Sequence, residues 1–191
     1  VVKINRQDKK IVVKNLVTGE EYEEFYDKLV LSPGASPIRP RTIEGIYSPH
    51  VFTVRNVVDI KKLKDYLTVN NIQDIAIIGG GFIGVEVAEN LRLAGKNISL
   101  IEAQAQIMNP FDYDMVQILH KEMMDQGVQL ILNDGVRKIN SDSVELNSGK
   151  EVGAKAVVLA IGVAPEVGLA KDAGLEIGET GGIKVDHNYL T

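Results

Sequence analysis

The sequence predicts an α/β protein with a Rossmann-like domain, built on a parallel sheet with a small β-meander, and flanking antiparallel strands. Three observations carry this prediction. Short apolar runs alternate with helix-length amphipathic segments between residues 57 and 132, which is typical of βαβ units. The glycine-rich turn Gly79-Gly80-Gly81-Phe82-Ile83-Gly84 follows one of these runs. The first 26 residues instead contain short strand-like stretches separated by polar turns.

Composition excludes several classes of function. The 191 residues are 45% hydrophobic, enough for a core, and carry a net charge of −5, so we expect no nucleic-acid partner. No apolar run approaches the ~20 residues that cross a bilayer, so we expect a cytoplasmic protein without a membrane partner. The chain has no cysteine, which excludes disulfides and thiolate metal sites within it. We expect no metal site, and only structural or surface roles for the three scattered histidines, His50, His120 and His187.

The N-terminal third predicts a meander and then a connector. Strands are expected at residues 1–5, 11–15 and 21–26, a buried strand at 28–31, and a loop at 32–37. Residues 37–50 hold three of the six prolines, as expected of a segment between domains. The chain begins without methionine inside a predicted strand, so we expect a piece of a longer protein. The expected divisions are 1–50, a Rossmann-like domain at 51–172, and a return segment at 173–191.

The middle of the chain predicts β-α-β units. The helix at 82–94 would bury a face of Ile83, Val87, Leu91 and Ala94. Asp112 is a candidate N-cap for the helix that follows the second strand. In order, the expected elements are a helix at 57–66, a strand at 74–78, a helix at 82–94, a strand at 97–102, a helix at 114–126, a strand at 128–132, a meander at 136–152 and a buried strand at 154–161.

The glycine motif predicts a dinucleotide site because it follows a strand and opens a helix. Gly79 permits the tight turn, Gly81 lets the backbone approach a pyrophosphate, and Gly84 lets the helix pack closely on the strand. The N-terminus of the helix then offers free N–H groups to the phosphates. The alternative is a glycine-rich turn in an α/β protein that binds nothing.

Glu102, at the end of the next strand, predicts which dinucleotide binds. A carboxylate there accepts hydrogen bonds from the ribose hydroxyls of the adenosine half. It repels a 2′-phosphate, and the following Ala103-Gln104-Ala105-Gln106 supply no arginine to hold one. We therefore expect NAD(H) in preference to NADP(H). The alternative for Glu102 is a solvated strand end.

Three further residues have two interpretations each. Phe82 lies over the nicotinamide position or packs between strand and helix. Glu86 contacts the carboxamide end of the cofactor or complements the helix dipole. Gly162, which follows the last buried strand, leaves room for the nicotinamide ring at the carboxyl edge of the sheet or simply ends the strand.

Four segments of the chain stand in a distinctive order. They are Tyr26–Ala35, Val51–Arg55, Gly79–Glu86, and Ala160–Pro165 followed by Gly181–Asp186. Together they resemble the flavin-dependent pyridine nucleotide-disulfide oxidoreductases, in the branch of NADH oxidases, NADH peroxidases and coenzyme A-disulfide reductases. One departure is Ala164, which stands where this family typically has an arginine.

The resemblance implies a function for the longer protein. NADH would reduce FAD, and the flavin would reduce a small-molecule disulfide, an oxidised cysteine or oxygen. Phe82 would be an aromatic gate that moves when NADH enters. The resemblance assigns a NAD site to Gly79, Gly81, Phe82, Ile83, Gly84, Glu86, Glu102 and Gly162, and part of a FAD site to Ser32, Pro33, Gly34 and Ala35.

The resemblance also places the first FAD fingerprint, the redox cysteine and a C-terminal homodimerisation domain outside this chain. We therefore expect no catalytic residue here, and a fragment that binds NADH without turnover. Two other functions stay open: a rubredoxin or ferredoxin reductase or nitrite reductase-type flavoprotein, and a non-catalytic module that senses NADH.

Overall fold

The computed structural model describes residues 1–191 and contains two compact units. One comprises Val1–Ser36 with Val163–Thr191, and the other comprises Pro37–Gly162. The divisions at 36/37 and 162/163 differ from the 50/51 and 172/173 that the sequence suggested. The proline-containing connector falls within the second unit because Ile46, only 1% exposed, packs into the core of that unit.

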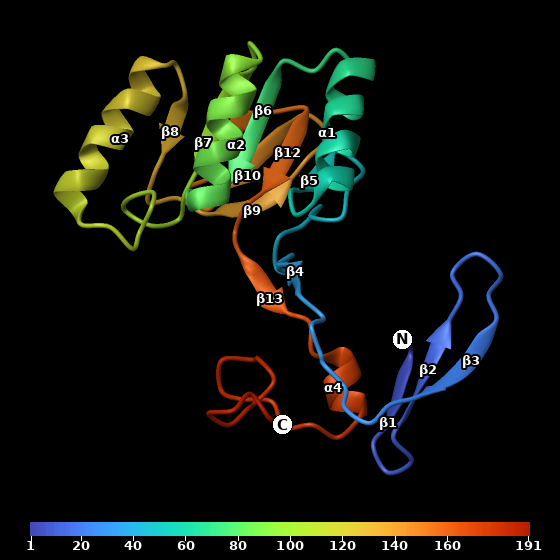
Figure 1. Cartoon of the computed structure of the whole chain (residues 1–191). Coiled ribbons are helices and arrows are strands. Elements are labelled where there is room, and N and C mark those ends of the chain that lie inside the picture. Colours follow the sequence, from blue (N-terminus) through green and yellow to red (C-terminus); the bar gives the residue numbers. More distant parts are fainter. The chain divides into compact units, whose positions relative to one another are not determined.

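The Pro37–Gly162 unit is built on a five-stranded sheet in which every pairing is parallel (Figure 1). The central strands are continuous apolar runs, as expected of strands that are covered on both faces. The strands, in sheet order, are β5 (Val51–Thr53), β12 (Ala156–Leu159), β6 (Asp74–Ile78), β7 (Asn97–Ile101) and β8 (Gln129–Ile131). The predicted Rossmann-like α/β arrangement is confirmed.

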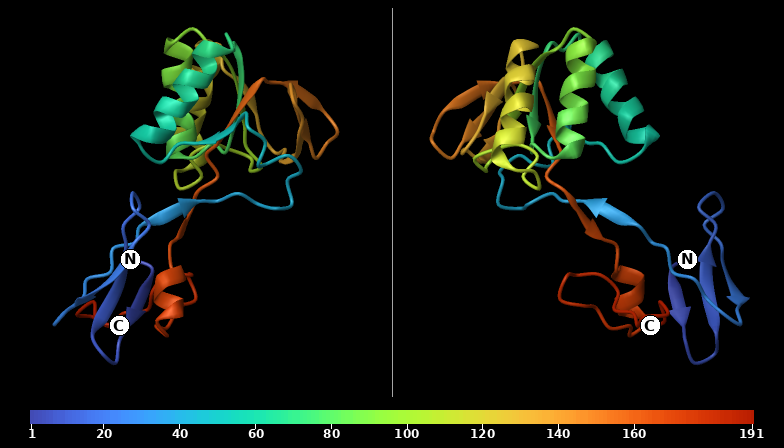
Figure 2. Two further views of the ribbon diagram at one scale, coloured as in Figure 1. Left: turned by 90° about the vertical axis from the view of Figure 1, so that its right-hand side faces the viewer. Right: turned by 60° about the vertical axis from the view of Figure 1, so that its left-hand side comes forward.

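Helices cover one face of this sheet and a meander covers the other (Figure 2). Ile75 and Ile77 of β6 pack with the helices, whereas Ala76 and Ile78 pack with the meander, because side chains alternate along a strand. The helices are α1 (Val57–Val69), α2 (Phe82–Leu93) and α3 (Tyr113–Asp125), and the antiparallel meander is β9 (Val136–Ile139), β10 (Ser143–Leu146) and β11 (Glu151–Gly153).

The buried face of α2 differs from the predicted one. Ile83 is 43% exposed and Ala94 is exposed, whereas Gly84 and Ala88 are buried. A Cβ on Gly84 would overlap the carbonyl oxygen of Gly79. Two of the predicted residues, Val87 and Leu91, are half-buried and pack against the core on this face of the sheet. The helix begins so close to the strand–turn segment that Gly84 and Ala88 form the closest part of its contact face.

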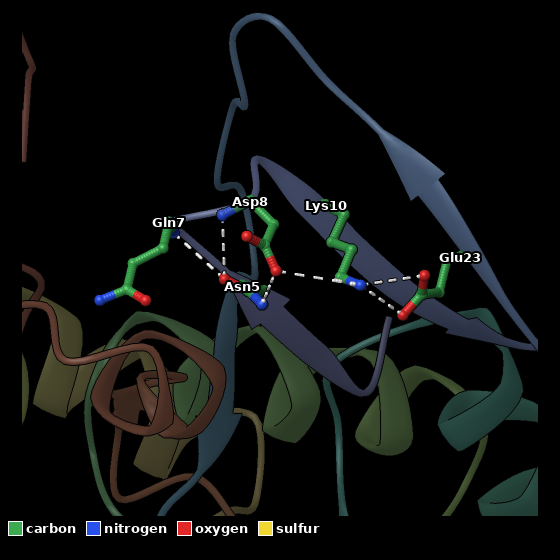
Figure 3. Close-up of polar contacts among 5 residues, drawn as sticks. All are labelled: Asn5, Gln7, Asp8, Lys10 and Glu23. Atoms are coloured by element: carbon green, nitrogen blue, oxygen red, sulfur yellow. Dashed lines mark hydrogen bonds and ion pairs between the residues drawn. The ribbon is translucent and has the colours of Figure 1, made fainter.

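The other unit begins with the predicted antiparallel meander. Its strands are β1 (Lys3–Asn5), β2 (Lys10–Lys14) and β3 (Glu21–Phe25), in the order β1-β2-β3. At the β1–β2 turn, the Asn5 side-chain oxygen accepts the N–H groups of Gln7 and Asp8, each at 3.1 Å (Figure 3). Lys10 lies 2.9 Å from Glu23, and this hydrogen-bonded carboxylate raises the pKa of the Lys10 ammonium.

The strand predicted at residues 28–31 is wrong. Residues 28–31 have no strand conformation, and Val30 is 85% exposed. An apolar run becomes a buried strand only when neighbouring strands pair with its backbone. No strand of this chain pairs with residues 28–31. The remaining elements are β4 (Ala35–Pro37), which ends one residue past the division at 36/37, its partner strand β13 (Val163–Pro165), and α4 (Gly168–Asp172). None of the helices is both long and apolar enough to span a membrane.

Candidate nucleotide-binding cleft

The turn from β6 into α2 depends on glycine at two consecutive positions, Gly79 and Gly80, for different reasons. Gly79 has φ +104°, which L side chains rarely adopt, and its N–H donates to the carbonyl of Ile101 at 2.8 Å. A Cβ on Gly80 would overlap the side chain of Ile107. Gly81 is the N-cap of α2, and no side chain caps this helix. The first N–H groups of α2 therefore lack helical partners.

Gly81 is unlike its neighbours because nothing within the protein requires glycine there. Its φ of −77° and ψ of −174° are open to any residue. A Cβ at this position would meet no protein atom within 4 Å. Gly84, one turn along α2, is required by packing, as described above. The space beside Gly81 thus lies open directly in front of the uncapped N-terminus of α2.

Glu102 is held in place by backbone donors on both of its oxygens. Gly80 N–H donates to Oε2 at 2.7 Å, and Gln104 N–H donates to Oε1 at 2.8 Å. These contacts fix the carboxylate between the glycine turn and the loop that follows β7. A carboxylate has about four lone-pair positions, so further donors can still bind it.

A cleft of about 450 Å³ lies at the carboxyl edge of the parallel sheet, where ligands of open α/β sheets bind. It brings together six of the residues singled out from the sequence, which are Gly79, Gly81, Phe82, Ile83, Glu102 and Gly162. Gly84 lies beneath the turn, and Glu86 is exposed on α2; neither lines the cleft. Ser32, Pro33, Gly34 and Ala35 belong to the other unit.

Gly162 lines the cleft from the segment that follows β12, the strand that pairs with β6. Its φ is +102°, and its carbonyl accepts the N–H of Ile38 at 3.0 Å. The positive φ favours glycine at position 162 whether or not a ligand binds nearby. Its neighbours Ala160 and Ile161 also line the cleft.

The sequence analysis missed one wall of the cleft. This wall is the loop between β7 and α3, which contributes Gln104, Gln106, Met108, Asn109 and Pro110. Met108 N–H donates to the Gly80 carbonyl at 2.7 Å, so the loop is tied to the glycine turn. The rule that ligands bind beyond the carboxyl ends of parallel strands could have pointed to this loop, because it follows such a strand.

His120 of α3 holds the same loop from behind. It is 5% exposed, and its Nε2 accepts the N–H of Ile107 at 3.3 Å. Burial lowers the pKa of this imidazole, since the charged form loses solvation. This contact keeps Ile107 packed against Gly80. Neither of the other two histidines lines the cleft: His50 contacts the Asn140 carbonyl, and His187 is exposed in the other unit.

The fold and this cleft define a Rossmann-like α/β unit of the kind found in FAD- and NAD-dependent oxidoreductases. The family model for pyridine nucleotide-disulphide oxidoreductases matches residues 1–191. The chain therefore belongs to the pyridine nucleotide-disulphide oxidoreductase family.

Known proteins are similar to this chain along all or nearly all of its length. A coenzyme A disulfide reductase from Staphylococcus epidermidis is 31% identical over 191 residues, which are 100% of this chain and 43% of the relative. A structure of reduced CoADR-RHD from Bacillus anthracis is 45% identical with a TM-score of 0.96, covering 100% of this chain and 34% of that one. The NADH-bound water-forming NADH oxidase from Lactobacillus brevis is 29% identical with a TM-score of 0.85, covering 94% and 40%. The chain thus spans less than half the length of these relatives.

Proposed function

We propose that the cleft binds NADH and that this chain supplies the nicotinamide-dinucleotide site of a flavin-dependent oxidoreductase. The observation that carries the proposal is the open space beside Gly81, which neither backbone conformation nor packing explains. A group bound there would meet the free N–H groups of α2, which favour a pyrophosphate. A side chain at this position would fill that space.

The other cleft residues fit the remaining parts of the ligand. Glu102 would accept the ribose hydroxyls of the adenosine half, and its charge would disfavour a 2′-phosphate. Gly162 would leave room at the nicotinamide end. The Lactobacillus brevis oxidase, a relative of similar fold, was solved with NADH. When bound, NADH supplies a hydride, and this chain's residues bind and orient the cofactor.

We further propose that the whole protein reduces a coenzyme A disulfide or a related small-molecule disulfide through FAD. The support is the name of the curated relative and family membership. Ser32–Ala35 would contribute to the FAD site, and this assignment rests on the family alone. The 191-residue chain by itself should not catalyse reduction of a disulfide, because it has no cysteine to exchange with that disulfide. Reduction of coenzyme A disulfide by this chain with added FAD, at enzyme-like rates, would contradict that expectation.

A fluorescence titration of the chain with NADH and with NADPH tests the binding proposal. We expect saturable NADH binding and weaker NADPH binding. No saturable change with NADH would refute the proposal. Replacing Glu102 by alanine should weaken NADH binding and narrow the gap between the two cofactors.

Glu102→Gln is the matched control for that variant. It keeps an acceptor oxygen for one of the two backbone N–H groups that Glu102 now binds, but it removes the charge. If charge sets the preference, this variant should also bind NADPH relatively better. An unchanged NADH-to-NADPH ratio in both variants would remove Glu102 from the adenosine site.

A further inference from the structure

Two aromatic rings meet at the mouth of the cleft. Phe82, the first residue of α2, lines the cleft and is 61% exposed. Its ring contacts Phe111 edge-on, with ring centroids 6.0 Å apart and planes at 64°. Phe111 itself does not line the cleft. Its ring can therefore affect a bound cofactor through its contact with Phe82.

Phe111 is held by the loop rather than by Phe82. Its N–H donates to the carbonyl of Met108 at 2.9 Å, and its own carbonyl accepts the side-chain amide of Gln106 at 2.9 Å. Met108 in turn donates its N–H to Gly80. The ring of Phe111 is thus attached to the same loop that is tied to the glycine turn.

Phe82 has fewer restraints of its own. It begins a helix, is mostly exposed, and its one aromatic neighbour is Phe111. An exposed phenylalanine changes rotamer within nanoseconds, so a single ring contact can decide which rotamer dominates. The contact holds Phe82 against the β7–α3 loop, at a ring that stands outside the cleft lining.

We propose that Phe111 is a positioning residue that keeps Phe82 against the loop and so keeps the cleft open for the nicotinamide half of NADH. This inference rests on the proposed function. Without Phe111, Phe82 would spend part of its time over the cleft. The apparent affinity for a ligand falls by the fraction of protein in the binding-competent state.

Edge-to-face pairs of this kind predict a modest effect. Phe111→Ala should raise the NADH dissociation constant roughly two- to tenfold. Phe111→Tyr, which keeps the ring, should bind NADH like the original chain. Phe111→Leu keeps apolar bulk without the ring and should resemble the alanine variant. Far-UV circular dichroism and thermal melting of each variant show whether it is folded.

A double-mutant cycle with Phe82→Ala tests the coupling. In the Phe82→Ala background, Phe111→Ala should leave the NADH dissociation constant unchanged, since the residue acts through Phe82. A merely structural role for Phe111 would give the same loss in both backgrounds, and that additivity would overturn the inference.

The outcomes separate the two proposals. If the original chain shows no saturable NADH binding, the proposed function fails and this inference fails with it. If the original chain binds NADH and folded Phe111→Ala binds equally well, only this inference fails. Tighter binding by Phe111→Ala would also overturn it, since the contact would then hold Phe82 in the ligand's place.

Discussion

Alanine at Gly81 and alanine at Gly84 should separate ligand binding from folding. The two glycines lie three residues apart around the start of α2, yet a methyl group meets opposite surroundings at them. At Gly84 it overlaps the Gly79 carbonyl oxygen and lies 3.4 Å from the Ala160 Cβ. At Gly81 it meets no protein atom within 4 Å.

The energies follow from these surroundings. Gly84→Ala gains about 1 kcal/mol of helix propensity, but overpacking costs about 1–3 kcal/mol, and a backbone oxygen gives way less easily than a side chain. We expect a net loss near the upper end, about 2 kcal/mol, which lowers Tm by about 4–8 °C. Gly81→Ala loses about 0.5–1 kcal/mol at the N-cap and recovers about 0.4–1 kcal/mol from the unfolded chain. Its Tm should change by less than about 2 °C.

NADH binding should be affected mainly by Gly81→Ala, the variant whose Tm changes least. The methyl group of Gly81→Ala would occupy the space proposed for the pyrophosphate. Overpacking of about 1–3 kcal/mol corresponds to a roughly 5- to 150-fold weaker NADH affinity. Thermal melting by circular dichroism and NADH titration by fluorescence measure the two effects. Unchanged NADH affinity in Gly81→Ala would refute the assignment of that space, and an unchanged Tm in Gly84→Ala would refute the packing argument.

Three other predictions concern stability. Leu100→Ala, at a fully buried position of β7, should cost about 2–5 kcal/mol in urea unfolding; a smaller loss would show that the sheet collapses around the cavity. Val17→Thr, at a hairpin position that is 95% exposed, should change stability by less than about 0.5 kcal/mol, and a larger loss would reveal a contact of this tip. The lowered pKa of His120 means that the unfolded chain binds its proton first as pH falls. Stability should therefore decline below about pH 6.5, and His120→Gln should lessen this decline in unfolding curves at about pH 7.5 and 5.5. An identical pH dependence in both proteins would exclude His120 as a source.

Local sequence patterns predicted much of the Pro37–Gly162 unit, because its strands, helices and turns depend on residues that are close in the sequence. The runs that became β6, β7 and β12 are apolar along their length, and the segment between β6 and β7 has helical periodicity that ends at Gly95. The strand–glycine–helix order therefore placed the turn, and the position after β7 placed Glu102. Both follow from backbone rules that act within a few residues.

The predictions that were wrong concern features that depend on contacts between residues far apart in the sequence. The run at 28–31 is as apolar as a buried strand, but a strand also needs partners, and none in this chain pairs with it. The predicted face of α2 is half right: Val87 and Leu91 pack against the core, whereas Ile83 and Ala94 are exposed. The structure shows that close approach to the glycine turn selects Gly84 and Ala88.

The sequence by itself determined the Rossmann-like order of elements, the glycine turn and the acidic residue after the second strand, since each depends on neighbours along the chain. Only the tertiary structure decided that the β7–α3 loop forms a wall of the cleft, that His120 supports it, and that Phe111 meets Phe82. These contacts join residues that are far apart in the sequence, such as His120 with Ile107 and Phe111 with Phe82. No periodicity in sequence encodes them, because they arise only when the parallel strands bring their carboxyl ends to one edge.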